Sequence, residues 1–380
     1  MKQFNSKSYI ISSLDEMESI RNEWTEIYEG NSVKPHYLSF EYVRLWYSCF
    51  ALPDQVRIYR IVDNDITIGF LPLVMKNKYN LKVMNSLTNF HCMHSGALVR
   101  NGYELQFSEI LYRILHSKVC SWDIIHYKYI YTFVKRDGFP LDYDSNILCK
   151  YYQKHSFPNY VICLGNSFKD YFINLDQKFR RNYNLSKNRS VRLGINTFKH
   201  YDGLEAIRQW PNLVMLEDLG WKGDNLSSLK RIGLNYQKYY NGLLELLAEL
   251  GTLRMFFWLL DDKPIAGGIG YIENDVFHWW KAGYDPAYHA ISPSNLLLFS
   301  IIDYLIANCP NVKRINMFSG DFGYKHRYCN EEAYCSEIII YNRTLMGVGV
   351  YICGEIKRKA KNYKIIIKII ELFRKYRSNK

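Results

Sequence analysis

The sequence predicts an α/β (α+β) fold made of two consecutive units, each a mixed and largely antiparallel sheet flanked by helices. In each half, apolar residues first recur at helical spacing, and two strands with alternating apolar residues then meet at a tight turn. A helix and a further strand follow each pair. The predicted strand pairs are 56–62 with 66–74 and 253–260 with 265–272. The repeated order indicates an internal duplication, and two unrelated α/β domains are the alternative.

The first unit is predicted to span residues 1–150. Segments 14–28 and 39–50 show helical spacing of apolar residues, and the first strand pair turns at Asp63-Asn64-Asp65. Segment 105–117 reads as a helix and 122–129 as a strand.

The second unit is predicted to span residues 151–345, and the region 131–160, rich in Asp, Pro, Lys and Tyr, is expected to contain the link. Its strand pair turns at Asp261-Asp262-Lys263-Pro264. The remaining elements are predicted as helices 168–192, 203–217, 228–250 and 295–307 and strands 276–282, 313–318 and 337–341. A basic amphipathic helix over 346–380 completes the chain.

Composition narrows the class of protein. No stretch of 18 apolar residues is present, so no membrane span is expected, and residues 1–5 lack the apolar core of a signal peptide. The nine cysteines form no C-x-x-C pair, which favours reduced thiols in a cytoplasm. His91-Cys92-Met93-His94 has no second ligand pair at a suitable spacing, so no metal site is expected.

The positive charge is concentrated in the tail. Residues 355–380 hold ten Lys/Arg against two Glu, a net charge of +8 out of +12 for the chain. On a helix over 356–377, Ile366, Ile369, Ile370 and Phe373 fall on one face, with Lys364, Lys368 and Arg374 off it. This pattern predicts peripheral contact with an anionic inner leaflet, and a helix docked on its own domain is the alternative.

Two polar clusters follow neighbouring predicted strands. The first, 279–288, leads into Ser292-Pro293-Ser294 and a helix, and the second covers 319–327. A helix that begins after a strand presents free N–H groups and its positive dipole end, which together bind anions. Ser292 or Ser294 could cap this helix with Pro293 in its first turn. The alternative to an anion-binding site is an ordinary N-cap without a ligand.

Five motifs occur in order along the chain. They are Glu23-Trp24 with 40–46, Phe70-Leu71-Pro72-Leu73, Leu219-Gly220-Trp221-Lys222-Gly223, Lys281-Ala282-Gly283-Tyr284-Asp285-Pro286, and Gly320-Asp321 with Tyr324-Lys325. In these motifs the chain resembles GNAT-superfamily acyltransferases of the BioF2-like or CelD-like type. These are tandem GNAT-fold proteins related to the Fem aminoacyltransferases and found in bacterial polysaccharide clusters. The chain departs from them where Asn316-Met317-Phe318 replaces Asp-Phe-Gly, and it lacks the usual pyrophosphate loop.

The resemblance implies an N- or O-acyltransferase that acts on a sugar in surface-polysaccharide biosynthesis, with the first unit a degenerate copy. Acetyl-CoA or another acyl-CoA would be the co-substrate, and the acceptor a sugar, a sugar nucleotide or a lipid-linked sugar. The residues expected to bind the co-substrate are Tyr284, Tyr288, Ser292, Ser294 and Asn295.

The candidate catalytic residues are Asp321, Lys281 and Tyr324. Asp321 could accept the acceptor's proton or form an ion pair with Lys325 or Arg327. Lys281 could stabilise a carbonyl oxygen that gains charge, or pair with a surface carboxylate. Tyr324, or Tyr284, could protonate a leaving thiolate. No serine or cysteine has a recognisable nucleophile setting, which favours direct transfer.

The expected substrate-binding residues are Trp221, Lys222, Lys325 and Arg327, with a packing role as the alternative for Trp221. The basic run 178–192 is either a solvated face or a contact for an anionic carrier or an aminoacyl-tRNA. Two other functions therefore stay open: a Fem-like transferase that uses aminoacyl-tRNA, and a non-catalytic binding protein with the same fold.

Overall fold

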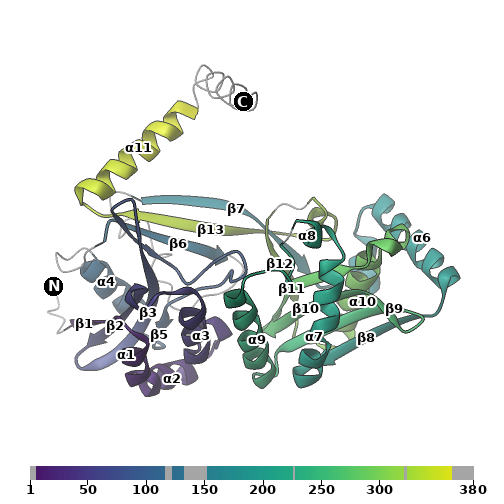
Figure 1. The fold of residues 1–380 in the computed structure, drawn as a ribbon, viewed down its shortest axis with the longest axis horizontal. Coiled ribbons are helices and arrows are strands. Elements are labelled where there is room, and N and C mark those ends of the chain that lie inside the picture. The colour runs from purple at the N-terminus through teal and green to yellow at the C-terminus, as the bar shows by residue number, and fades with distance from the viewer. Residues whose placement is uncertain (1–5, 116–121, 132–151, 226, 321–322, 362–380) are drawn as a thin grey trace.

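The computed structural model describes residues 6–115, 122–131, 152–225, 227–320 and 323–361 (Figure 1). Its strands form one sheet in the order β1-β2-β3-β4-β6-β13-β7-β12-β11-β10-β9-β8, with β5 paired to β3. Most neighbours are antiparallel, while β4–β6 and β11–β12 are parallel. This mixed sheet with helices on its faces confirms the predicted fold class.

The first half of the chain forms one end of this sheet. Its hairpin turns at Asn64 and Asp65, which both adopt left-handed φ angles, of 47° and 62°. Ser13 and Ser39 cap the first and third helices by accepting hydrogen bonds from Glu16 N and Tyr42 N. The elements are β1 Ser6–Ile11, α1 Leu14–Ser19, α2 Arg21–Gly30, η1 His36–Leu38, α3 Phe40–Phe50, η2 Pro53–Gln55, β2 Val56–Asp63, β3 Ile66–Lys78, β4 Leu81–Asn85, β5 Leu98–Val99, α4 Glu104–Leu115 and β6 Ile124–Tyr131.

The second half repeats much of this order. Asp261 and Asp262 turn its hairpin with left-handed φ angles of 47° and 65°. The elements are β7 Tyr152–Cys163, α5 Phe168–Ile173, α6 Gln177–Leu193, β8 Asn196–Asp202, α7 Gly203–Asp218, α8 Trp221–Asp224, α9 Leu234–Glu249, β9 Leu253–Leu260, β10 Lys263–Glu273, β11 Val276–Tyr284, η3 Pro286–Ile291, α10 Pro293–Asn308, β12 Arg314–Ser319, η4 Lys325–Arg327, β13 Glu331–Tyr341 and α11 Leu345–Lys361.

Two long strands join the halves. β13, near the C-terminus, pairs with β6 of the first half on one side and with β7 on the other, while β7 pairs with β12. The last strand of the second half, β13, therefore lies beside β6 and extends the sheet of the first half. In Figure 1, β7 and β13 run across the molecule between the two ends of the sheet.

Helices cover both faces of the sheet, and one core is shared by the two halves. On one face, α2 and α3 pack together with α7 and α9, and their buried residues form a continuous cluster. On the opposite face, α4 covers the first half and α5, α6 and α10 cover the second. Strand β9 is buried on both faces: Met255 and Phe257 belong to the shared cluster, whereas Phe256 belongs to the α10 side.

Most predicted elements are present, with three kinds of difference. The predicted helix 14–28 is divided at Ile20, and 168–192 is divided where Asp176 caps α6 through Phe179 N. β7 begins inside the region expected to be a link. β1, β4, β5 and β8 were also not predicted. In the described part of the chain, no helix has both the length and the apolar character needed to cross a membrane.

Candidate active site

The sheet separates between β11 and β12. These parallel strands pair only at Val276–Arg314, Phe277–Ile315 and His278–Asn316, and a cavity of about 700 Å³ opens beyond the last pair. Asn316 ends the pairing because its Oδ1 accepts the Phe318 N–H at 2.9 Å and Phe318 adopts a φ of 60°. The strand therefore bends away from β11 at this point.

Asn316 occupies the position where the resembling family has an aspartate. It is fully buried, its Nδ2 lies 3.2 Å from His278 Nδ1, and its Oδ1 accepts a bond from Asn159 Nδ2 at 3.2 Å. A neutral amide fits this site because it both donates and accepts without bringing a buried charge. Asn316 thus shapes the bend in β12 rather than acting as a carboxylate.

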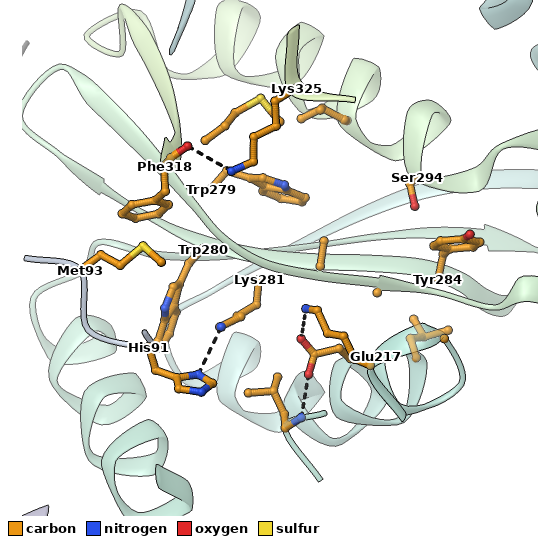
Figure 2. Close-up of a pocket in the computed structure, with 18 of the residues that line it drawn as sticks. His91, Met93, Glu217, Trp279, Trp280, Lys281, Tyr284, Ser294, Phe318 and Lys325 are labelled. Atoms are coloured by element: carbon orange, nitrogen blue, oxygen red, sulfur yellow. Dashed lines mark hydrogen bonds and ion pairs between the residues drawn. The ribbon is translucent and has the colours of Figure 1, made fainter. Parts of the chain in front are cut away.

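A bulge in β11 places the side chains of Trp279 and Lys281, which are two residues apart, on opposite faces of the sheet. Trp279 pairs with Gly270 and Lys281 with Ile269, so Trp280 is the extra residue. Figure 2 shows Trp279, Phe318 and Lys325 on one side of β11 and Lys281, His91 and Glu217 on the other. The cavity is consequently lined from both faces of the sheet through the gap between β11 and β12.

On the first face, the cavity meets the start of α10. Ser292 adopts a left-handed φ of 49°, and its carbonyl accepts the N–H groups of Asn295 at 2.9 Å and Leu296 at 3.3 Å. Ser292 is the N-cap residue of α10, with Pro293 in the first turn as predicted, but its hydroxyl makes no capping hydrogen bond. Ser292, Ser294 and Asn295 line the cavity, and Tyr328 holds Asn295 through a hydroxyl bond to Oδ1 of 2.6 Å.

On the second face, four charged or polar side chains form a network. Glu217 at the end of α7 is buried, pairs with Lys222 Nζ, and accepts the Leu229 N–H at 2.7 Å. Burial, with a smaller contribution from the Lys222 charge, lowers the pKa of Lys281 to about 8. The Lys281 amine, which is mostly protonated at pH 7 but has a lowered pKa, therefore lies in the cavity wall near the Glu217 carboxylate.

His91 joins this network from the first half of the chain. Its Nδ1 accepts the Tyr240 hydroxyl at 2.6 Å and faces Lys281 Nζ at 3.4 Å. Burial, followed by the Lys281 charge, lowers the pKa of His91 to about 3, so the ring is neutral and Nε2 carries its proton. The site thus contains a fixed imidazole supplied by the other half.

The structure brings together most of the residues that the sequence proposed. The following line the cavity: Lys281, Tyr324, Tyr284, Ser292, Ser294, Asn295, Lys222 and Lys325. Lys325 is buried, and its Nζ donates to the carbonyls of Phe318 at 3.0 Å and Ser319 at 3.2 Å, so it secures the end of β12.

Other predicted residues lie elsewhere. Tyr288 and Arg327 do not line the cavity; Tyr288 packs near Lys263 Nζ, and Arg327 is exposed on η4. Asp321 lies outside the described residues, as does the side chain of Trp221. Their predicted roles in binding and catalysis stay predictions.

The sequence reasoning missed His36 and Glu217 and gave His91 no function. Glu217 lies two residues before the Leu219–Gly223 motif, which was its available signal, whereas His36 stands in a segment without a recognisable pattern. His91 and His94 had been considered as metal ligands. Across the described residues, no group of three or more His, Cys, Asp or Glu side chains could hold a metal ion.

Comparisons with known proteins agree with this geometry. Residues 177–326 match the family model described as an acetyltransferase (GNAT) domain. The fold is similar to a conserved protein of unknown function from Bacteroides thetaiotaomicron, with a TM-score of 0.52 and 13% identity over 88% of this chain and 100% of the other. It is also similar to FemX, with a TM-score of 0.52 and 10% identity over 90% and 99% of the two chains.

No curated protein matches the chain in sequence. The structural similarities, at such low identity, show the fold alone. Together with the family match, they show that the chain has a tandem-like GNAT fold in which residues 177–326 are similar to a GNAT acetyltransferase domain.

Proposed function

We propose that the protein transfers an acyl group from a coenzyme A thioester, most simply acetyl-CoA, to a sugar amine or hydroxyl. The observation that carries the proposal is the gap between β11 and β12 with the start of α10 beside it. Strands that separate leave backbone N–H and C=O groups unpaired, and an extended chain with amide groups can pair with them. The start of a helix favours a negatively charged group.

The residues present fit an acyl-CoA. The α10 side of the gap offers the Ser294 N–H, the positive end of the helix dipole, and a partly apolar wall that includes Trp279 and Leu297. Bound there, the thioester supplies an activated acyl carbon. Lys281, from the opposite face of the bulge, would stabilise the negative charge that develops on the carbonyl oxygen. Tyr324 keeps its predicted role as the acid. For Asp321 both predicted roles stay open, as a proton acceptor or as an ion-pair partner of Lys325 or Arg327.

The wall on the α7–α9 side supports a sugar as the acceptor. Trp280 and His91 line the cavity, and Tyr240 lies behind them with its ring centroid 5.0 Å from that of Trp280. Aromatic faces pack against the C–H groups of sugar rings, and charged side chains such as Glu217 and Lys222 hydrogen-bond hydroxyl groups. The surface-polysaccharide context rests on the sequence motifs.

The test measures binding and transfer separately. Calorimetry with acetyl-CoA should show binding, and a thiol-release assay with glucosamine and other amino sugars should show turnover. Asp321→Asn should lower turnover by about a hundredfold or more while the fold survives. Asp303→Asn, an exposed carboxylate of α10, is the matched control. If wild-type protein binds amino sugars but transfers from no donor, a non-catalytic binding protein is the better description.

An aminoacyl-tRNA donor is the second candidate, and the position of α6 favours it. This helix packs against η3 and α10, and its Arg189 donates to the Ala290 carbonyl of η3 at 3.5 Å, just ahead of α10. The exposed basic residues are Lys178, Arg181, Lys187, Arg189 and Arg192. Binding of charged tRNA that weakens steeply with salt, together with no heat of binding for acetyl-CoA, would favour this donor.

Peripheral attachment of this enzyme to the inner leaflet is also proposed. α11 extends away from the body of the molecule in Figure 1, with Leu345 and Ile356 exposed by 95% and 62%. Residues 362–380, which hold much of the tail charge, lie outside the described part. Deleting 355–380 should abolish co-sedimentation with anionic vesicles and leave turnover on a soluble acceptor intact. Unchanged vesicle binding, or loss of the fold, would contradict a membrane role.

A further inference from the structure

A buried histidine–glutamate pair joins the two halves at the cavity. His36, in η1 of the first half, lines the cavity, and Glu273 ends β10 of the second half. Glu273 Oε1 accepts both the His36 Nδ1 proton at 2.9 Å and the His36 backbone N–H at 2.8 Å. The two side chains are 5% and 11% exposed. The double contact fixes the imidazole in one orientation.

The carboxylate determines which nitrogen of His36 carries the proton. Burial would raise the pKa of Glu273, but the nearby His36 and its hydrogen bonds outweigh burial and hold that pKa below its usual value. Since an ionised carboxylate only accepts, Nδ1 must donate to it, and Nε2 of a neutral ring is left with a lone pair. Among the described residues, no hydrogen bond satisfies Nε2 of this cavity-lining ring.

None of the described titratable groups around the pair competes with His36 for a hydrogen bond to the Glu273 carboxylate. His278 Nε2 is 4.0 Å from Glu273 Oε2, and burial, with a smaller effect of His36, lowers the pKa of His278 to about 4, so that ring is neutral. Tyr42 from α3 and Tyr271 from β10 lie against the His36 ring at 5.2 Å and 4.7 Å, and burial raises their pKa values well above the usual range.

Two further rings of the first half lie near this pair: Tyr37 of η1 and His94 between β4 and β5. His94 has its ring centroid 6.4 Å from that of His36 and stacks on Tyr37 at 5.1 Å. His94 also lies 5.4 Å from Phe318, at the bend of β12, and Tyr271 lies 6.5 Å from Trp280, at the bulge of β11. His36 therefore lines the same cavity as the gap, and one ring lies between it and each side of the gap.

We propose that His36, oriented by Glu273, is the general base that receives the acceptor's proton; this rests on the acyltransferase function proposed above. As the acceptor nitrogen or oxygen forms its bond to the acyl carbon, its proton moves through one water molecule to His36 Nε2, and the carbon–sulfur bond breaks. The leaving thiolate takes a proton from Tyr324 or solvent. The Glu273 carboxylate stabilises the imidazolium that results. The first half would then contribute a catalytic residue instead of only shaping the cleft.

The test uses substitutions that keep the fold. His36→Asn retains an N–H donor for Glu273 but has no basic nitrogen, so kcat with acetyl-CoA and glucosamine should fall by about a hundredfold or more while acetyl-CoA binding is unchanged. Glu273→Gln removes the negative charge that favours the imidazolium. It should therefore move the acidic limb of the kcat/KM profile to lower pH. His155→Asn, an exposed histidine of β7, is the control.

The outcomes separate this proposal from the function on which it rests. A folded His36→Asn protein with normal turnover, or a Glu273→Gln protein whose acidic limb stays in place, overturns the role of His36 and leaves the acyltransferase intact. A merely structural pair would change the unfolding temperature but not the acidic limb. If wild-type protein itself neither binds acetyl-CoA nor transfers to glucosamine, the proposed function fails, and the role of His36 in it falls as well.

Discussion

Replacing Lys281 by methionine should stabilise the protein and lower its turnover. Burial, with a smaller effect of Lys222, lowers the pKa of Lys281 from 10.5 to about 8. At about 1.4 kcal/mol per pKa unit, holding the charged amine costs the folded state about 3 kcal/mol at pH 7. Methionine has a similar length and no charge, so the free energy of unfolding should rise by up to that amount. Turnover should fall by about a hundredfold if the charge stabilises the carbonyl oxygen.

The stability difference between Lys281→Met and wild type should depend on pH in a direction that tests this reasoning. The folded state releases the Lys281 proton near pH 8, before the unfolded chain does, so the cost is complete below pH 8 and shrinks as the pH rises toward 10.5. The advantage of Lys281→Met over wild type should therefore fall from about 3 kcal/mol at pH 7 to about 1 kcal/mol at pH 10. Taking the difference between two proteins removes the contribution of other groups that titrate in this range.

Lys222→Met is a matched control in which the free energy of unfolding should fall instead of rise. The Lys222 Nζ pairs with Glu217, whose side chain is 3% exposed, so Lys222→Met leaves a buried carboxylate that still accepts the Leu229 N–H. Removing one member of such a pair costs about 3 kcal/mol. Urea unfolding of both variants at pH 7 and pH 10 measures the effects. A destabilised Lys281→Met protein, or an advantage that does not change with pH, would refute the argument.

Two further predictions concern packing and thiol chemistry. Gly268→Ala should lower the melting temperature and weaken acetyl-CoA binding, because a Cβ would lie 1.9 Å from the Trp279 ring in the cavity wall; an unchanged melting temperature would show that the ring moves freely. Iodoacetamide at pH 8 should modify the exposed Cys163 and Cys353 but not Cys92, since burial raises the pKa of the Cys92 thiol to about 12. Mass spectrometry would detect the modified peptides, and rapid modification of Cys92 in the native protein would contradict the burial.

The two hairpins could be predicted because each depends on local signals. Alternating apolar residues mark the strands, and the pairs Asn64-Asp65 and Asp261-Asp262 tolerate the left-handed φ angles that a tight hairpin turn requires. β7 was missed because its first part, 152–158, carries polar residues and a proline and is largely exposed. Its pairing with β13 depends on residues about 180 positions away, which no local pattern records.

The site was predictable on one side of the sheet and not on the other. The strand-to-helix junction that contains Lys281 and Ser294 is a local pattern, and both residues line the cavity. His36 and His91 reach the same cavity from the first half because α3 packs on α9, a contact between residues about 200 positions apart. Their types alone were uninformative, since an isolated histidine has many ordinary roles.

The placement of β13 has a consequence for how the chain can be made. Ile338 and Ile340 of this strand pack with α4 and pair with Tyr127 and Ile125, so the first half lacks part of its core until they arrive. During synthesis, more than 200 residues must emerge after β6 before its neighbour is available. Contacts this distant in sequence form slowly, and an unpaired strand edge can associate with other chains. Until residue 341 leaves the ribosome, the first half therefore exposes the edge of β6, and a chaperone that binds extended segments has a defined period in which to act.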